Sequence, residues 1–271
     1  MRTEREMMEM ILSVAKNMEN VRAVAMNGSR TNPHIKPDRM QDFDVVYLVR
    51  DMQPLVSDKT WVDCFGERVI MQTPEDMDLF PPSLDGRYTF LMQFVDGNRI
   101  DLMLVPLEQA QHYIHEDSLT RVLLDKDGLF PPLPPPDDTD YRVKCPVQKD
   151  FDDCCNEFWW LSTYVAKGLW RGEILYAMSM LNIVRDMLLL MLDWYMGAQT
   201  NFTRSAGKCH KFLPQYLPGK WVQRLLATYG LPSIEQIWQA LFEAYALFGE
   251  AACVVARICL LYTSPSPRDC S

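Results

Sequence analysis

Short apolar runs separated by polar turns fill the first half of the chain. The runs are rich in β-branched, aromatic and aliphatic residues, which favour strands. They cover residues 21–26, 43–49, 68–71, 89–95 and 100–105, with a shorter run at 122–125. Asp96-Gly97-Asn98 predicts a turn that joins the fourth and fifth runs as a hairpin. Thr3 and Glu6 form a capping-box pattern before apolar residues at helical spacing, so a helix is predicted ahead of the first strand.

The pattern changes after residue 150, where apolar and aromatic residues recur at helical spacing. Helices are predicted over residues 150–169, 172–196, 217–229 and 233–261. Residues 129–140 read Leu-Phe-Pro-Pro-Leu-Pro-Pro-Pro-Asp-Asp-Thr-Asp. This segment cannot form a helix or a central strand, because proline lacks an amide donor and fixes φ.

These patterns predict an α+β fold with two domains. We expect a mixed β-sheet with flanking helices over residues 1–128, a Pro-rich linker over 129–149 and an all-helical domain over 150–262. Residues 263–271 contain two prolines and continue no earlier pattern, so we expect a non-native or disordered tail that leaves some apolar surface near the last helix uncovered.

Charge narrows the classes of partner. The 271 residues include 27 basic and 36 acidic side chains, for a net charge of −9. This balance argues against nucleic-acid binding, which depends on neutralising phosphates with Lys and Arg. An acidic surface attracts a polycationic small molecule instead, although many acidic proteins bind no cation.

Cysteine usage and apolar segments bear on location. The eight cysteines form no Cys-x-x-Cys pairs, which suits neither a zinc site nor a disulfide framework, so we expect reduced thiols and a cytoplasmic protein. The N-terminus has no long apolar core, which argues against a signal peptide. The densest apolar run, residues 187–192, is too short to cross a bilayer, so no membrane association is expected.

The candidate chemistry lies in the first half. A Gly28-Ser29 turn follows the first predicted strand, Asp42 and Asp44 stand at the start of the second, and Asp101 lies in a later apolar run. Alone, an Asp-x-Asp is usually a solvated strand end, and a Gly-Ser turn is weaker still. The ordered combination is more restrictive, because three carboxylates on neighbouring strands can hold divalent cations and a small turn can receive a phosphate. It favours a metal-dependent nucleotidyl-transfer site.

This arrangement resembles the nucleotidyltransferase superfamily. More narrowly, the chain resembles aminoglycoside 6-adenylyltransferases, the streptomycin-modifying enzymes, from the N-terminus to about residue 250. The segments that carry the resemblance are residues 26–33, 41–47, 71–82 and 157–173. The last of them, from Trp159-Trp160 to Arg171, is the most specific. The resemblance implies an N-terminal catalytic domain followed by a helical substrate-binding domain.

Adenylyl transfer assigns roles to the motif residues. We expect Asp42 and Asp44 to hold Mg²⁺, with Asp101 completing a second metal site, taking the hydroxyl proton, or both. Gly28, Ser29 and Arg30 are expected to grip the β- and γ-phosphates of ATP. The resemblance gives the same roles to Gly28, Ser29, Asp42 and Asp44, while Asp101 matches by position and strand context.

The helical half supplies further candidates. A cation for the leaving pyrophosphate could be Lys208, which we prefer because a glycine precedes it; the alternatives are Lys167, Arg171 and Lys211, and each is more often a solvated surface charge. The guanidinium groups of a streptomycin-like acceptor call for carboxylates and aromatic faces. The predicted acceptor-binding residues are Glu157, Trp159, Asp186 and Asp193. For Trp159, packing in the core is the favoured alternative.

Three hypotheses for function follow. The first is transfer of AMP from ATP to a streptomycin hydroxyl, which would confer antibiotic resistance. The second is transfer to another small hydroxyl or a protein side chain. The third is a non-catalytic, antitoxin-like binding module, against which the intact carboxylates and Gly-Ser turn argue. The expected partners are ATP and a cationic aminoglycoside, and we expect a monomer, with a weak dimer as the alternative.

Overall fold

The computed structural model describes residues 1–80 and 85–262, and the predicted tail at 263–271 lies outside them. The chain forms two compact units, one covering Met1–Asp140 and the other beginning at Tyr141. The division falls inside the segment predicted as a linker. Each unit has its own hydrophobic core and is described by itself.

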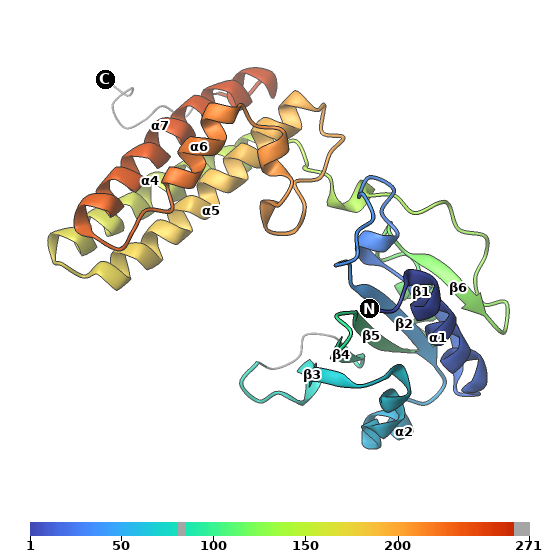
Figure 1. The fold of residues 1–271 in the computed structure, drawn as a ribbon. Coiled ribbons are helices and arrows are strands. Elements are labelled where there is room, and N and C mark those ends of the chain that lie inside the picture. Colours follow the sequence, from blue (N-terminus) through green and yellow to red (C-terminus); the bar gives the residue numbers. More distant parts are fainter. Residues whose placement is uncertain (81–84, 263–271) are drawn as a thin grey trace. The chain divides into compact units, whose positions relative to one another are not determined.

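The first unit is built on a six-stranded mixed sheet with the order β3-β4-β5-β2-β1-β6 (Figure 1). Its strands are β1 (Val21–Met26), β2 (Phe43–Val49), β3 (Arg68–Gln72), β4 (Tyr88–Phe94), β5 (Arg99–Pro106) and β6 (Arg121–Asp125). The central strands β2 and β5 run parallel, and the other neighbouring strands are antiparallel. The predicted α+β fold and the hairpin between β4 and β5 are thus confirmed.

Alternation along the strands separates two apolar faces. On β2, Phe43, Val45 and Tyr47 point into a core with α1 (Glu4–Asn17), whose buried residues are Met7, Ile11 and Ala15. The opposite face buries alternate strand residues against α3 (Ala110–Tyr113). Period-2 alternation therefore gives each strand residue one of two environments.

The start of α1 is fixed by the capping box that the sequence predicts. Thr3 accepts a hydrogen bond from the Glu6 amide, and Glu6 accepts from the Thr3 amide, which completes the capping box. Next to the cap, Arg2 donates to Asp96 in the β4–β5 turn and to the Phe65 carbonyl. The turn and the helix start are therefore tied together.

Several short elements carry no sequence pattern strong enough to predict them. They are α2 (Gln53–Ser57) and 3₁₀-helical turns at Lys59–Phe65, Pro74–Asp76 and Thr139–Tyr141. Two further 3₁₀ turns, Gly28–Arg30 and Leu107–Gln109, lie where the sequence predicts a Gly-Ser turn and a helix over residues 107–115. Elements this short contribute one or two core residues each, such as Leu55 from α2. A periodicity needs more turns than that to become visible.

The Pro-rich segment lies against the first unit along much of its length. Residues 130–136 line a hollow together with the β6 residues Arg121, Val122 and Asp125. Beyond it, the Asp137 amide donates to the Ser118 carbonyl at 3.0 Å, and Asp138 is 3% exposed. Residues up to Asp140 therefore belong to the first unit, as the division of the chain indicates.

The second unit is helical. It contains α4 (Gln148–Trp170), α5 (Ile174–Gln199), α6 (Gly219–Ala227) and α7 (Ile234–Ile258), with 3₁₀ turns at Lys208–His210 and Leu213–Gln215. Phe158 of α4 stacks on Phe248 of α7 at 3.8 Å between ring centroids.

The predicted end of α5 at residue 196 was short by one turn. Gly197 continues the helix and instead provides room for Phe202, because a Cβ there would lie 2.5 Å from that ring.

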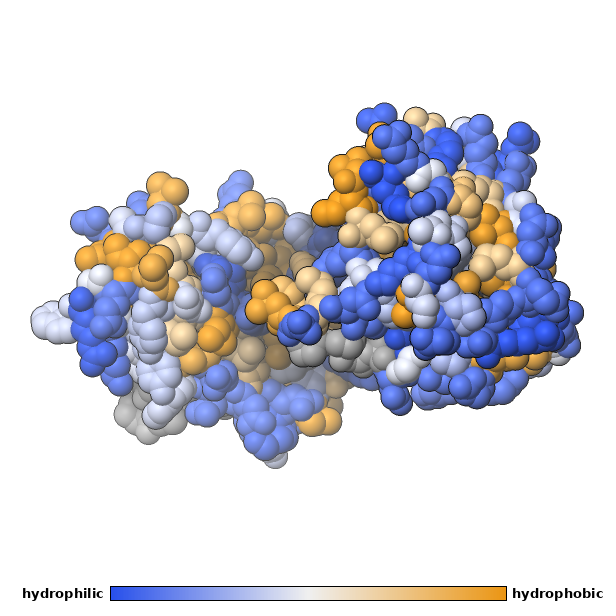
Figure 2. Space-filling view, turned by 90° about the horizontal axis from the view of Figure 1, so that it is seen from below, coloured by the Kyte–Doolittle hydropathy of each residue, from blue (hydrophilic) through white to orange (hydrophobic). Residues whose placement is uncertain are grey.

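The long helix α5 is apolar enough, by length and composition, to cross a membrane. In this structure it packs against both α4 and α7 as the central helix of its unit. Arg185 lies on its buried side, where it donates to Thr228 Oγ1 at 3.0 Å and stacks over the Tyr229 ring. On the face drawn in Figure 2, apolar residues form separate patches among hydrophilic ones.

Candidate active site

The three predicted aspartates lie at one end of the two central strands. Asp44 of β2 is the direct partner of Asp101 on β5 in the parallel register. Both are out of phase with the strand residues that face α1, so their side chains point to the α3 side of the sheet. Asp42 lies two residues before Asp44, and its carboxylate lies 3.7 Å from the same arginine that binds Asp101. The strand pairing thus places Asp44 beside Asp101, and Asp42 lies near the arginine that binds Asp101.

The Gly28 turn lies directly on Asp44. Gly28 has φ of 77°, which favours glycine, and a Cβ at this position would come 2.1 Å from Asp44 Oδ2. The amide of the preceding residue, Asn27, donates to the Asp44 carbonyl at 3.0 Å. Only a residue without a side chain allows this approach of the turn to the carboxylate.

A network of hydrogen bonds that the sequence did not reveal fixes the position of the Gly28 turn. Asn27 Nδ2 donates to Thr120 Oγ1 at 2.7 Å and to Asp117 Oδ2 at 3.2 Å. The buried hydroxyl of Tyr113 donates to Asn27 Oδ1 at 2.5 Å, and burial raises the pKa of that phenol. Both hydrogen-bonding ends of the Asn27 amide are therefore used, which fixes the residue that begins the turn.

Arg99 is a further residue that the sequence analysis missed. Its Nε and Nη2 donate to the two oxygens of Asp101 at 2.7 and 2.8 Å, a bidentate pair. This contact raises the pKa of Arg99. Because Arg99 also lies near Asp42, one internal cation neutralises part of the acidic cluster.

The carboxylates of Asp42, Asp44 and Asp101 are suitable ligands for a hard cation, but they do not form a complete metal site in this structure. Carboxylate oxygens are the ligands that Mg²⁺ prefers. Among the described residues, however, no three acidic, His or Cys side chains are gathered closely enough to hold a metal ion. Arg99 takes both oxygens of Asp101. The donor chemistry of Asp42, Asp44 and Asp101 fits a divalent metal, whereas in this structure Asp101 is bound by Arg99.

The structure places Arg30 differently from its two neighbours in the turn. Its guanidinium donates to the backbone carbonyls of Gln41 and Asp42, pairs with Glu4 and lies over the Phe43 ring at 3.7 Å. Its side chain is 6% exposed, and burial lowers the pKa of this group. Arg30 therefore holds the segment that leads into Asp42. Ser29 contributes its carbonyl to the same segment, as acceptor for Gln41.

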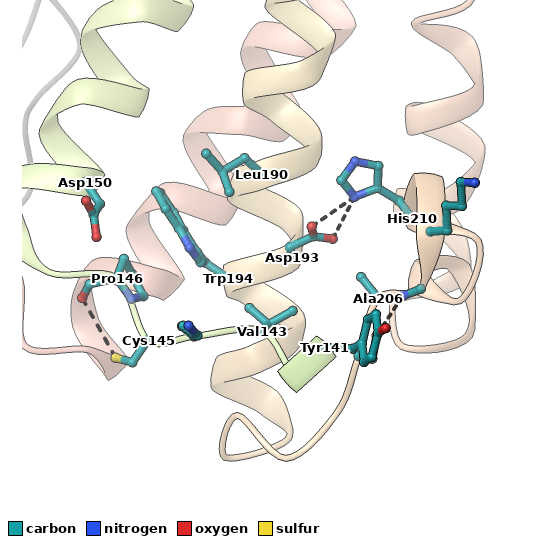
Figure 3. A pocket seen from close by; sticks show the side chains of 14 residues that line it. Tyr141, Val143, Cys145, Pro146, Asp150, Leu190, Asp193, Trp194, Ala206 and His210 are labelled. Carbon is teal, nitrogen blue, oxygen red and sulfur yellow. Dashed lines mark hydrogen bonds and ion pairs between the residues drawn. The ribbon is translucent and has the colours of Figure 1, made fainter. Parts of the chain in front are cut away.

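In the second unit, Asp193 and Lys208 line one cavity of about 570 Å³ (Figure 3). His210, which the sequence analysis did not select, binds the Asp193 carboxylate there through Nδ1. A second hollow, lined in part by Glu157, shares Asp150, Leu190 and Trp194 with the first. The two hollows are thus neighbours.

The remaining predicted residues lie elsewhere in this unit. Trp159 is half-buried against Phe158 and Tyr245, with ring centroids 5.0 Å apart in each pair, so it belongs to the helical core. Asp186 and Lys167 are exposed. Lys167 lies over the Tyr164 ring at 5.5 Å. None of these three lines the cavity that contains Asp193, as far as the described residues extend.

Comparison with known proteins decides the family. A family model described as streptomycin adenylyltransferase matches residues 1–268. The chain belongs to this family. An aminoglycoside 6-adenylyltransferase of Bacillus subtilis (strain 168) is 45% identical over 250 residues, which cover 92% of this chain and 88% of that protein. A protein of the same name from Campylobacter jejuni is 46% identical over 257 residues, covering 94% and 89%.

A solved structure of a member is also similar. The crystal structure of an aminoglycoside 6-adenyltransferase from Bacillus subtilis is 39% identical in sequence and covers 97% of this chain and 93% of its own, with a TM-score of 0.45. Membership in the streptomycin adenylyltransferase family makes the chain a nucleotidyltransferase enzyme. The family's reaction implies ATP as co-substrate and typically a divalent metal.

Proposed function

We propose that the protein transfers AMP from ATP to a hydroxyl of streptomycin in a Mg²⁺-dependent reaction and thereby confers resistance to the drug. The observation that carries this proposal is the pairing of Asp44 with Asp101 beneath the Gly28 turn. In the reaction the acceptor oxygen attacks the α-phosphorus, the bond to the bridging oxygen breaks, and pyrophosphate leaves. The hydroxyl proton must pass to a base.

Each catalytic-unit residue has a proposed part in this step. Asp42, Asp44 and Asp101 would hold two Mg²⁺ ions, which when bound supply positive charge to the phosphates and the attacking oxygen. Asp101 can accept the hydroxyl proton, ligate metal, or do both, once Arg99 no longer takes its oxygens. Gly28 and Ser29 receive the β- and γ-phosphates at the turn, whereas Arg30 acts on them through the backbone of the segment that it holds.

The helical unit is proposed to bind the acceptor and the leaving group. Lys208 is our choice for the pyrophosphate, with Lys167 as the second candidate. Asp193 and Glu157 line neighbouring hollows and are suited to the guanidinium groups of streptomycin. Asp186 is an exposed residue of α5 and adds negative charge near this region. Trp159 contributes by holding α4 to α7.

The same site would serve a different small hydroxyl acceptor, which is the second candidate function. The acidic balance of the chain and the carboxylates of the two hollows favour a cationic acceptor over a neutral one. We propose a cytoplasmic monomer that acts on small molecules and not on nucleic acid.

The test is mass spectrometry of the drug after incubation with the protein, ATP and Mg²⁺. We expect streptomycin to gain one AMP with release of pyrophosphate, and kanamycin to remain unmodified. Omission of Mg²⁺ should stop the reaction. Modification of kanamycin but not streptomycin would overturn the substrate assignment, and absence of AMP on any hydroxyl acceptor would overturn the catalytic one.

A further inference from the structure

The cavity of the second unit contains a His–Asp contact that the transfer chemistry does not use. His210 Nδ1 lies 2.9 and 3.1 Å from the two oxygens of Asp193, and both residues line the cavity of about 570 Å³ (Figure 3). The Asp193 side chain is 14% exposed and that of His210 is 33% exposed. The imidazole therefore contacts a carboxylate that is itself largely buried.

The backbone that presents His210 is strained. Cys209 and His210 have φ of 54° and 59°, a left-handed conformation that costs non-glycine residues about 1 kcal/mol each. The surrounding loop holds them in it: Phe212 donates its amide to the Ala206 carbonyl at 2.9 Å, and its ring packs on Gly207. Strain of this kind persists where a side chain must be held in one place.

The charges around His210 come from several elements. Asp193 on α5 contacts it, and hydrogen bonding to Asp193 is the largest cause that raises the pKa of His210. The charge of Asp186 on the same helix acts in the same direction. Burial acts in the opposite direction. The other titratable groups that line the cavity are Tyr141, Lys144, Cys145, Asp150 and Lys208.

We propose that Asp193 is the counter-ion for a guanidinium group of the acceptor, and that protonated His210 competes with this group for the same carboxylate. Below the pKa of His210 the imidazolium occupies Asp193 and binding is weakened. Above it the neutral ring yields the carboxylate to the drug. The inference rests on the proposed function, because it takes a guanidinium-bearing acceptor as the ligand.

The competition has a quantitative consequence. Guanidinium groups stay protonated throughout the relevant range, so the charge of the drug group that binds Asp193 does not change with pH. Each bound drug displaces one proton, and linkage then limits the gain in affinity to about tenfold per pH unit below the pKa of His210. Above that pKa the affinity should level off.

The test is calorimetric titration of the full chain with streptomycin, without ATP or Mg²⁺, from about pH 5.5 to about pH 8.5. We expect wild-type affinity to rise on the order of tenfold over this range. In His210→Asn the rise should be lost, with tighter binding than wild type at the acidic end. Asparagine tolerates the left-handed backbone well, and its amide nitrogen, which takes the place of Nδ1 beside Asp193, carries no charge at any pH. Asp193→Asn should weaken binding at the alkaline end and also remove the pH dependence.

A matched control is His115→Asn, which removes an exposed histidine of the first unit and should keep the wild-type pH profile. If wild-type affinity is flat across the range, or if His210→Asn keeps the full rise, the inference is wrong. The wild-type profile alone decides if the variant does not fold. AMP transfer measured on the same sample separates the two proposals. Transfer with a flat binding profile overturns only the role of His210, whereas absence of both binding and transfer overturns the function itself.

Discussion

At the scale of single residues, the close approach of Gly28 to Asp44 is the tightest constraint in the site. The turn needs a left-handed backbone and also needs empty space where a side chain would begin. The need for empty space is the one that bears on function, because any Cβ at Gly28 must displace the carboxylate of Asp44. The protein contains a control for the first: Gly128 has φ of 65° with no atom within 4 Å of a Cβ.

We therefore predict different outcomes for the same substitution at two sites. Gly128→Ala should cost only backbone strain, about 1 kcal/mol, and leave AMP transfer near wild type. Gly28→Ala should lose at least about a hundredfold in transfer rate, because it moves the Asp44 carboxylate that we propose as a metal ligand. Parallel melting curves and initial rates measure both effects. Equal activity of the two variants would show that the approach to Asp44 has no role.

The residue scale also shows what the sequence could and could not predict. Gly28, Asp42, Asp44 and Asp101 were predictable because spacing and strand context mark them. Arg99 was not, since an arginine two residues before an aspartate is unremarkable until the strand points both side chains to one side. His210 was missed for a similar reason: its partner lies on another element, 17 positions away.

At the scale of elements, the start of α1 and the β4–β5 turn stabilise each other. Asp96 accepts from the side chain and the amide of Arg2, at 2.7 and 3.0 Å, and from Asn98. These contacts hold the pKa of Asp96 well below its usual range. A lowered carboxyl pKa stabilises the fold above the unfolded-state value, near 3.9, and this contribution is lost as the pH falls toward the folded-state value.

The consequence is a pH-dependent difference between wild type and Asp96→Asn. Near neutral pH the variant should unfold with a free energy about 1 kcal/mol lower, a value reduced for the partial exposure of the pair. The difference should narrow as the pH drops below about 4. Glu9→Gln is the control, since it removes only an exposed pair with Arg5 on the same helix and should change little. Denaturant unfolding at several pH values measures the free energy of unfolding of wild type and of both variants. A difference between wild type and Asp96→Asn that stays constant with pH would contradict the assignment.

At the scale of the whole molecule, two patterns of hydrophobic spacing produce two independent cores. Period-2 runs gave the strands and helical spacing gave α4 to α7, so both parts of the fold were predictable from sequence. The packing of the Pro-rich segment was less predictable. Its prolines exclude regular structure, which the sequence shows, but they do not say whether the segment packs. Contacts of Asp137 and of the hollow beside β6 place it with the first unit.

The central claim is that strand pairing makes Asp101 part of one catalytic cluster with Asp42 and Asp44. The measurement that tests it most directly is the initial rate of AMP transfer to streptomycin in Asp101→Asn beside Asp51→Asn. Asp51 lies just beyond the opposite end of β2 and is exposed, so its variant removes the same charge from the same unit. The account predicts a loss of more than about a thousandfold in Asp101→Asn, with an unchanged fold, and a near wild-type rate in Asp51→Asn. A rate for Asp101→Asn within about threefold of the control would contradict it.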